Sequence, residues 1–226
     1  MAGHANRERR TGPPVDVPPV LPTVLPIVDS AVHESRGLRP LLAVEELIEA
    51  GAPLIWWRDP ERRVPLEELA AHLPLSRIVL SARSTTAALG LHAAAGQHWG
   101  GPAWRDASVL PGRSADDAHS PRLCGASAHS LADLAIAARL GCHYATLSPI
   151  FPSDSKPGYG PALGLSTLRD AATQYPALAV LALGGVSLPR LAELHGAGAH
   201  GVAALGAFAC ARPGDVWRAW RDAWGE

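Results

Sequence analysis

The chain has 226 residues, and its 20 Lys and Arg against 21 Asp and Glu give a formal net charge of -1. This balance excludes the basic surface typical of nucleic-acid binding, and it excludes an acidic tail. With 47% hydrophobic residues the chain can bury one substantial core, which favours a single domain and excludes disorder throughout.

Residues 1–19 are rich in proline and arginine and show neither the period of a strand nor that of a helix. We expect a disordered tail over 1–19 and one folded domain over 20–226. From residue 20 onward, short apolar runs alternate with helical patterns. The predicted strands are residues 24–28, 54–58, 77–81, 97–100, 123–127, 144–150, 178–183 and 201–205. The predicted helices are residues 41–50, 66–72, 85–95, 130–140, 165–174, 189–196 and 216–224. Gly51, Gly96 and Gly141 are the expected helix stops.

Eight strands that alternate with helical segments predict a single-domain (βα)8 TIM barrel. Near-continuous apolar strands suit a parallel sheet that is covered by helices outside and filled by side chains inside. An open, doubly wound sheet gives the same alternation. We favour the barrel because polar and glycine-rich clusters follow strands five to eight, and barrel sites form at that end of the strands.

A histidine follows the fifth predicted strand, in the segment Gly125-Ala126-Ser127-Ala128-His129-Ser130. Because imidazole titrates near neutral pH, a histidine at the mouth of a barrel is suited to moving protons. The structural alternative is that Ser130 caps the next helix and that His129 is a solvated residue beside it.

A polar loop follows the sixth predicted strand, over residues 148–157. It contains Ser153, Ser155 and Lys156, and Lys156 is the single lysine among the 20 basic residues. Two hydroxyls and an ammonium that converge on one point suit a phosphate or diphosphate. The alternative is an ordinary polar turn.

Glycines follow the last two predicted strands, at Gly184-Gly185 and at Gly206 after Leu205. In barrels, the loops after strands seven and eight commonly bind a phosphate on backbone N–H groups. Each glycine pair taken singly indicates only a tight turn, but the order of the three segments is specific.

In this order the segments resemble the thiamine-phosphate synthase/TenI family over residues 20–211. The family pattern is Gly-x-Ser-x-His-[Ser/Thr], then Gly-Pro-[Val/Ile]-[Phe/Tyr]-x-Thr-x-Thr-Lys, then Gly-Gly, then Gly-x-Ala-Gly-Ala-x-Gly-[Val/Ile]-Ala. These motifs correspond here to residues 125–130, 148–156, 184–185 and 195–203.

The resemblance implies a (βα)8 barrel that binds a thiazole phosphate in the thiamine pathway. It implies substrate contacts from Ser153, Ser155 and Lys156, at the family's two threonines and lysine. It assigns the thiazole phosphate to Gly184, Gly185, Leu205 and Gly206. His129 matches the histidine that thiazole tautomerases use for proton transfer.

The N-terminal half departs from the synthases of this family. Their Gln-x-Arg-x-Lys strand, which grips a pyrimidine diphosphate, reads Trp56-Trp57-Arg58-Asp59-Pro60 here, so only Arg58 remains as a substrate contact. Ala82 and Ala103 stand at the two magnesium-binding aspartates. Without metal and lysine, the charge that develops on a departing pyrophosphate loses its main stabilisers. Trp56 shares a strand face with Arg58, so we expect an aromatic wall where the pyrimidine would lie.

We therefore predict a thiazole tautomerase that uses His129 as general acid and base, with no metal and no cofactor. Two alternatives stay open: a thiamine-phosphate synthase with a divergent diphosphate site, and a non-catalytic binder of thiazole or thiamine phosphate. The expected partner is a small-molecule thiazole phosphate, with neither nucleic acid nor membrane, and a homo-oligomer is left open.

The 3 scattered cysteines fit a reducing compartment. Prolines interrupt the apolar segment that a signal peptide would need after the charged start. No segment reaches the roughly 18 uninterrupted apolar residues of a membrane span. We expect a cytoplasmic protein.

Overall fold

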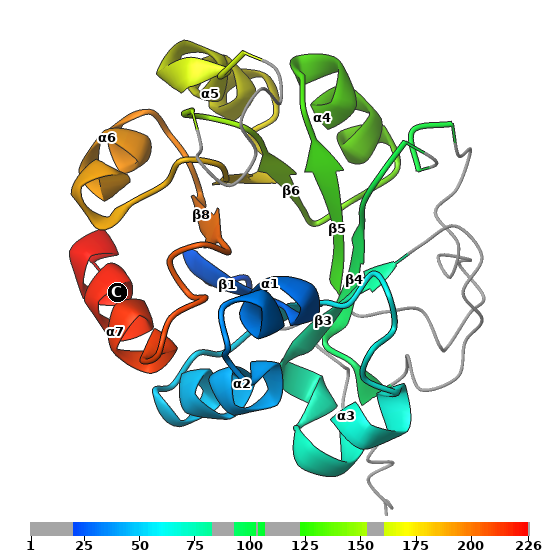
Figure 1. Ribbon diagram of the computed structural model, residues 1–226. Helices are drawn as coiled ribbons and strands as arrows, with labels where there is room; N and C mark the ends of the chain where they lie inside the picture. The colour runs from blue at the N-terminus through cyan, green and yellow to red at the C-terminus, as the bar shows by residue number, and fades with distance from the viewer. Residues whose placement is uncertain (1–19, 83–92, 103, 107–122, 153–160, 226) are drawn as a thin grey trace, which may run out of the picture.

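The computed structural model describes residues 20–82, 93–102, 104–106, 123–152 and 161–225. Within them, eight parallel strands close into a barrel in the order of the sequence (Figure 1), which confirms the predicted fold. The strands are β1 (Val24–Asp29), β2 (Ile55–Arg58), β3 (Ile78–Ala82), β4 (Gly96–Trp99), β5 (Leu123–Ala128), β6 (Tyr144–Leu147), β7 (Ala179–Ala182) and β8 (Gly201–Ala204). The expected tail over 1–19 lies outside the described residues.

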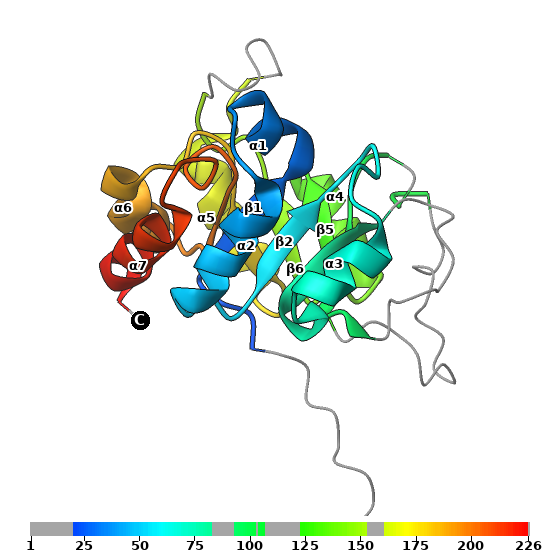
Figure 2. The same ribbon diagram turned by 60° about the horizontal axis from the view of Figure 1, so that its bottom comes forward.

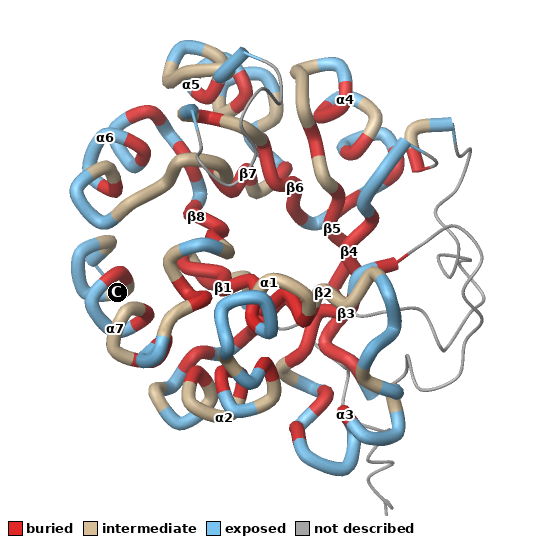
Figure 3. Tube along the Cα trace, in the orientation of Figure 1, coloured by how far each residue is buried: buried red, intermediate tan, exposed pale blue. Residues whose placement is uncertain are grey.

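Helices surround the barrel and turn exposed faces outward, whereas the strands are buried (Figure 3). They are α2 (Pro40–Glu49), α3 (Leu66–His72), α4 (Leu131–Arg139), α5 (Gly164–Gln174), α6 (Leu191–Gly196) and α7 (Pro213–Trp224). Helix α1 (Ser30–Ser35), which the sequence pattern did not predict, lies above the carboxyl end of β1 (Figure 2). In the described parts of the chain, no helix is long and apolar enough to span a bilayer.

Local signals in the sequence set several of these boundaries. Helices α2 and α7 begin at Pro40 and Pro213, where the missing N–H of proline costs no helical hydrogen bond. Helix α4 is capped by Ser130, whose hydroxyl accepts a hydrogen bond from the backbone N–H of Asp133. The chain leaves α7 through Gly225 at a φ of 98°, in the left-handed region that favours glycine.

The prediction for Gly96 is wrong. We expected a helix over 85–95 with Gly96 as its stop, but Gly96 opens strand β4, and Ala94 and Ala95 are not helical. A Cβ on Gly96 would overlap the backbone and side chain of Leu123 on the adjacent strand. The glycine therefore permits close approach of β4 and β5. Residues 85–92 of the expected helix lie outside the described residues.

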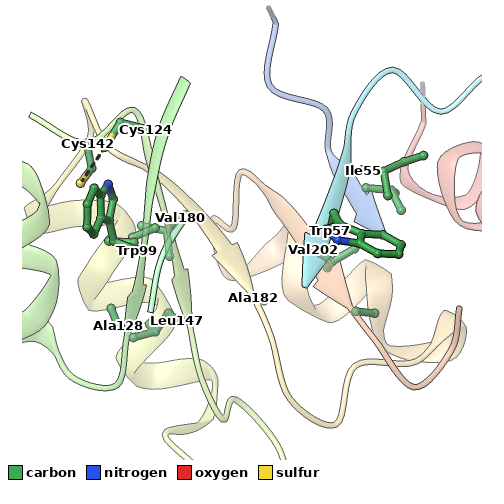
Figure 4. Packing of buried hydrophobic residues seen from close by; sticks show 14 of the residues in the cluster. Ile55, Trp57, Trp99, Cys124, Ala128, Cys142, Leu147, Val180, Ala182 and Val202 are labelled. Atoms are coloured by element: carbon green, nitrogen blue, oxygen red, sulfur yellow. Dashed lines mark hydrogen bonds between the residues drawn. The ribbon is translucent and has the colours of Figure 1, made fainter. Parts of the chain in front are cut away.

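The core has two parts that the strand alternation separates. One fills the barrel with inward side chains: Leu25, Ile27, Leu54, Trp56, Val79, Ala95, Leu123, Tyr144, Leu181 and Ala203. The other lies between strands and helices and includes Trp57, Trp99, Cys124 and Cys142 (Figure 4). Neighbouring tryptophans on β2 therefore face opposite ways, and Trp99 belongs to the outer layer, away from the barrel interior.

Gly125 makes room for the largest inward side chain. It pairs with Tyr144 across β5 and β6, and a Cβ at Gly125 would overlap the ring of Tyr144. Tyr144 is fully buried, so its ring has no path toward solvent. The glycine is thus required by packing inside the barrel.

We predict that Gly125→Ala lowers the free energy of unfolding by about 2 kcal/mol or more, because overpacking a closed core forces displacement of its neighbours. Gly196→Ala is the control, since a Cβ there contacts nothing within 4 Å. Urea denaturation of both variants measures the difference. Equal stabilities of the two variants would contradict this account of the interior.

Candidate functional site

The described site residues all lie at the carboxyl end of the barrel. His129 follows β5, Gly184 and Gly185 follow β7, Leu205 and Gly206 follow β8, and Arg58 ends β2. Ser153, Ser155 and Lys156 lie outside the described residues. The structure therefore brings together two groups of predicted residues, one on the loops after β5 to β8 and one at β2, on the opposite side of the barrel.

His129 is held by the loop that follows β6. Its Nδ1 donates a hydrogen bond to the backbone carbonyl oxygen of Ser148 at 2.8 Å, and the Ser148 hydroxyl lies 3.3 Å from the same nitrogen. A carbonyl oxygen only accepts, so this bond assigns the proton of the neutral ring to Nδ1. Nε2 is then the basic nitrogen. The histidine is half-buried.

Gly184 and Gly185 lie directly against the loop after β6. Their φ angles are 89° and 65°, and a Cβ on Gly184 would come within 2.8 Å of the Pro149 backbone. A Cβ on Gly185 would lie 2.5 Å from the Pro152 carbonyl oxygen. The backbone N–H of Phe151 also donates to the Gly184 carbonyl oxygen at 3.0 Å. Only glycine fits at both positions, and the loops after β6 and β7 form one packed unit.

Gly206 is different, because it is exposed and a Cβ there meets nothing within 4 Å. Its carbonyl oxygen accepts a hydrogen bond from Arg36 Nη1 at 3.1 Å, and the same nitrogen donates to the Ala209 carbonyl oxygen at 2.8 Å. Arg36 follows helix α1, so the loop after β8 is braced by the loop after β1. The backbone at Gly206 is thus held in place while its surface stays open.

On the opposite side of the mouth, Arg58 forms an ion pair with buried Asp29 of β1, with 3.3 Å between Nε and Oδ2. Asp29 also caps helix α1 by accepting from the Val32 N–H. The neighbouring carboxylate of Asp59 accepts from Ser30, Arg63 and Val64. Both acids of this region are therefore engaged in holding loops. Among the described residues, no cluster of three or more His, Cys, Asp or Glu side chains is arranged to bind a metal ion.

Between the two groups, an aromatic layer crosses the barrel interior. The Trp56 indole stacks on the His98 ring with 3.7 Å between centroids and donates from Nε1 to the Ser81 hydroxyl at 2.9 Å. His98 is hydrogen-bonded through Nδ1 to the Tyr144 hydroxyl and through Nε2 to the Ser127 hydroxyl, both at 2.9 Å. These contacts link strands β2 to β6. The aromatic wall predicted at Trp56 is thus part of a buried layer of side chains, and the polar atoms of this layer form the hydrogen bonds given above.

The buried layer is electrically neutral. Burial, and to a smaller extent the positive charge of Arg58, lowers the pKa of His98 from 6.5 to about 3. Burial also raises the pKa of Tyr144 well above its ordinary value. His98 therefore stays neutral near neutral pH.

Sequence reasoning missed several of these contacts. Nothing in the sequence pattern indicated a role for His98, whose ring stacks on that of Trp56, 42 positions earlier in the chain. Arg105 forms an ion pair with Asp133, and this pair was not anticipated because Arg105 lies in a stretch without a pattern. The spacing Ser130-x-x-Asp133 is a capping-box signal that places Asp133 beside the start of α4.

Comparison with known proteins identifies the family of this fold and site. A sequence profile described as thiamine monophosphate synthase matches residues 24–208, from the start of β1 to the loop after β8. The thiamine-phosphate synthase of Chloroflexus aurantiacus is 36% identical over 90 residues, which is 40% of this chain and 41% of that protein. The thiamine-phosphate synthase of Methanoculleus marisnigri is 40% identical over 87 residues, 38% of this chain and 40% of that protein. The chain thus spans about two fifths of the length of these curated relatives.

A solved structure extends the likeness to the whole barrel. Thiamine phosphate pyrophosphorylase from Pyrococcus furiosus superposes with a TM-score of 0.64 over 89% of this chain and 94% of that one, at 20% identity. At this identity the likeness shows the fold.

The neutral state of His98 predicts a loss of stability in acid. Folded His98 binds a proton only near pH 3, whereas the unfolded chain binds one near 6.5. The unfolded state therefore holds more protons between these values, and stability falls as pH falls from 6.5 toward 3. From pH 7 to pH 5, the loss from this residue is about 2 kcal/mol.

Urea denaturation of the parent and of His98→Gln at pH 7 and pH 5 measures this contribution. The quantity is the change in the free energy of unfolding between the two pH values, compared between the two proteins. His72→Gln, a surface change, is the control and should keep the parent's pH dependence. The same pH dependence in all three proteins would show that His98 is not held neutral.

Proposed function

The chain belongs to the thiamine monophosphate synthase family, and from that premise we propose that it binds a thiazole phosphate at the barrel mouth and catalyses proton transfer on it, as a thiazole tautomerase does. His129 is the proposed general acid and base. Gly184, Gly185, Leu205 and Gly206 are the proposed phosphate contacts, and Ser153, Ser155, Lys156 and Arg58 are further proposed substrate contacts.

One observation carries the proposal: the hydrogen bond from His129 Nδ1 to the Ser148 carbonyl oxygen. It holds the ring through Nδ1 and leaves Nε2 as the basic nitrogen, and a ring held in one orientation suits a general base. Proton abstraction from a heterocycle and its return at another atom require one such group and a fixed substrate. The loops after β7 and β8 flank the same side of the mouth, where barrels commonly bind phosphate.

Thiamine-phosphate synthase is the second candidate, and the names of the sequence relatives favour it. The geometry on the β2 side supports the tautomerase instead. The Trp56 side chain occupies the interior beneath Arg58, and the carboxylates of Asp29 and Asp59 are engaged with neighbouring groups. A diphosphate would need a metal or free cations on this side to stabilise its departure. A cytoplasmic location stays a prediction, and a homo-oligomer stays open.

We expect His129→Asn to lower the rate of proton exchange by roughly a hundredfold or more, with little change in affinity for the thiazole phosphate, because asparagine cannot carry the proton. The measurement is solvent deuterium incorporation into the thiazole phosphate carboxylate, followed by NMR. Equal rates for parent and variant would remove His129 from the reaction.

The same preparation should be assayed for coupling of thiazole phosphate to a pyrimidine diphosphate, with and without Mg²⁺. Robust, metal-dependent formation of thiamine phosphate would establish the synthase and overturn the tautomerase. We expect exchange that is insensitive to EDTA and no appreciable coupling.

Gly206 offers a clean test of the phosphate site, because a side chain there fits without overlap, whereas substitution at Gly185 would displace the loop after β6. We expect Gly206→Asp to weaken binding of the phosphorylated thiazole by about tenfold or more through charge repulsion. Gly206→Asn, similar in size but neutral, should bind within about twofold of the parent. Calorimetry with the thiazole phosphate and its free alcohol measures both. Equal losses for the two ligands would place the phosphate elsewhere.

A further inference from the structure

Arg105 and Asp133 form a two-residue clamp on the backbone of His129, and we propose that this clamp positions the imidazole for proton transfer. The inference rests on the proposed function of His129. Neither residue is proposed to contact substrate, so both are positioning residues. The clamp joins the loop after β4 to the first turn of α4.

Asp133 is the centre of the clamp. Its Oδ2 accepts the backbone N–H of His129 at 2.7 Å, and its Oδ1 accepts from Arg105 Nε at 2.5 Å. Arg105 Nη2 adds a second hydrogen bond to Oδ2 at 3.1 Å. The carboxylate therefore holds a guanidinium in a forked arrangement and the histidine backbone at the same time.

Arg105 is itself fixed by the barrel. Its Nη1 donates to the Gly101 carbonyl oxygen at 2.8 Å, and its Nη2 lies 3.4 Å from the Ser127 carbonyl oxygen. The guanidinium also lies over the Trp104 ring, 5.0 Å from the centroid. All three guanidinium nitrogens are thus engaged by protein groups. This arrangement suits a brace and leaves the arginine poorly suited to binding an anion.

The clamp is shielded from water, because the Arg105 side chain is 22% exposed and that of Asp133 is 12% exposed. Burial by itself would raise the pKa of Asp133, but the hydrogen bonds from Arg105 and the His129 N–H outweigh it and lower that pKa below its ordinary value. Asp133 is therefore ionised at neutral pH. Both strong hydrogen bonds persist under the conditions in which His129 would act.

The N-cap of α4 does not require the hydrogen bond between the Asp133 carboxylate and the His129 N–H. Ser130 already provides the N-cap through its hydroxyl, and in an ordinary capping box the acidic side chain returns to the N–H of the cap residue itself. Here it reaches the residue before the cap. The backbone of His129 is thus held from α4 and the loop after β4, while its ring is held by Ser148. These contacts hold both the backbone and the ring of His129.

The test compares Arg105→Gln and Asp133→Asn with Arg105→Lys, which keeps the charge, and with Arg139→Gln, an exposed arginine on the same helix. We expect deuterium exchange to fall about tenfold or more in the first two variants, because small misplacement of a catalytic group is costly. Affinity for the thiazole phosphate should stay within about twofold of the parent. Arg105→Lys should recover part of the rate, and Arg139→Gln should match the parent.

A second readout reports on His129 directly. In ¹⁵N spectra of histidine-labelled protein, the parent should show one set of His129 ring signals, and Arg105→Gln and Asp133→Asn should show broadened or doubled signals. Unchanged exchange and unchanged ring signals in folded variants would overturn the clamp, including where the only effect is a lower melting temperature. If the parent itself shows no exchange, the proposed function fails, and the ring signals alone decide whether the clamp positions His129.

Discussion

The need to fill a closed interior governs this barrel. Its eight strands leave no edge, so inward side chains must occupy a fixed volume. The absence of a side chain at Gly125 makes room for the Tyr144 ring. The Tyr144 hydroxyl is hydrogen-bonded to His98, whose ring stacks on Trp56. This chain of contacts crosses the barrel from β6 to β2. This layer of side chains supports the loops at the mouth of the barrel.

His98 and His129 lie in different surroundings. His98 lies beneath the surface, where burial and Arg58 lower its pKa to about 3 and keep it neutral. His129 lies above it on a loop, half-buried, with one ring nitrogen bonded to a backbone carbonyl. One histidine is therefore part of the packed interior, and the other lies at the mouth of the barrel. The distinction follows from depth in the barrel and not from residue type.

The two sides of the barrel mouth also differ from each other. On the side of β1 and β2, carboxylates and Arg58 hold the adjoining loops together. On the side of β5 to β8, glycines allow close packing of the loops after β6 and β7, which are joined by backbone hydrogen bonds. The two sides of the mouth therefore differ in what holds their loops together: carboxylates and Arg58 on one side, closely packed glycines on the other.

The sequence by itself determined the order of strands and helices, the barrel and the family, because apolar periodicity, helix caps and glycine motifs act over a few residues. It also brought His129 and the two glycine loops to one end of the strands. Only the tertiary structure decided the rest. Gly96 lies in a strand since β4 and β5 approach closely, and Trp99 faces the helices while Trp56 faces inward. The pairing of Arg105 with Asp133, 28 positions along the chain, depends on how closure of the barrel brings two loops together. Such contacts leave no periodic trace in a sequence, because they depend on distance in space.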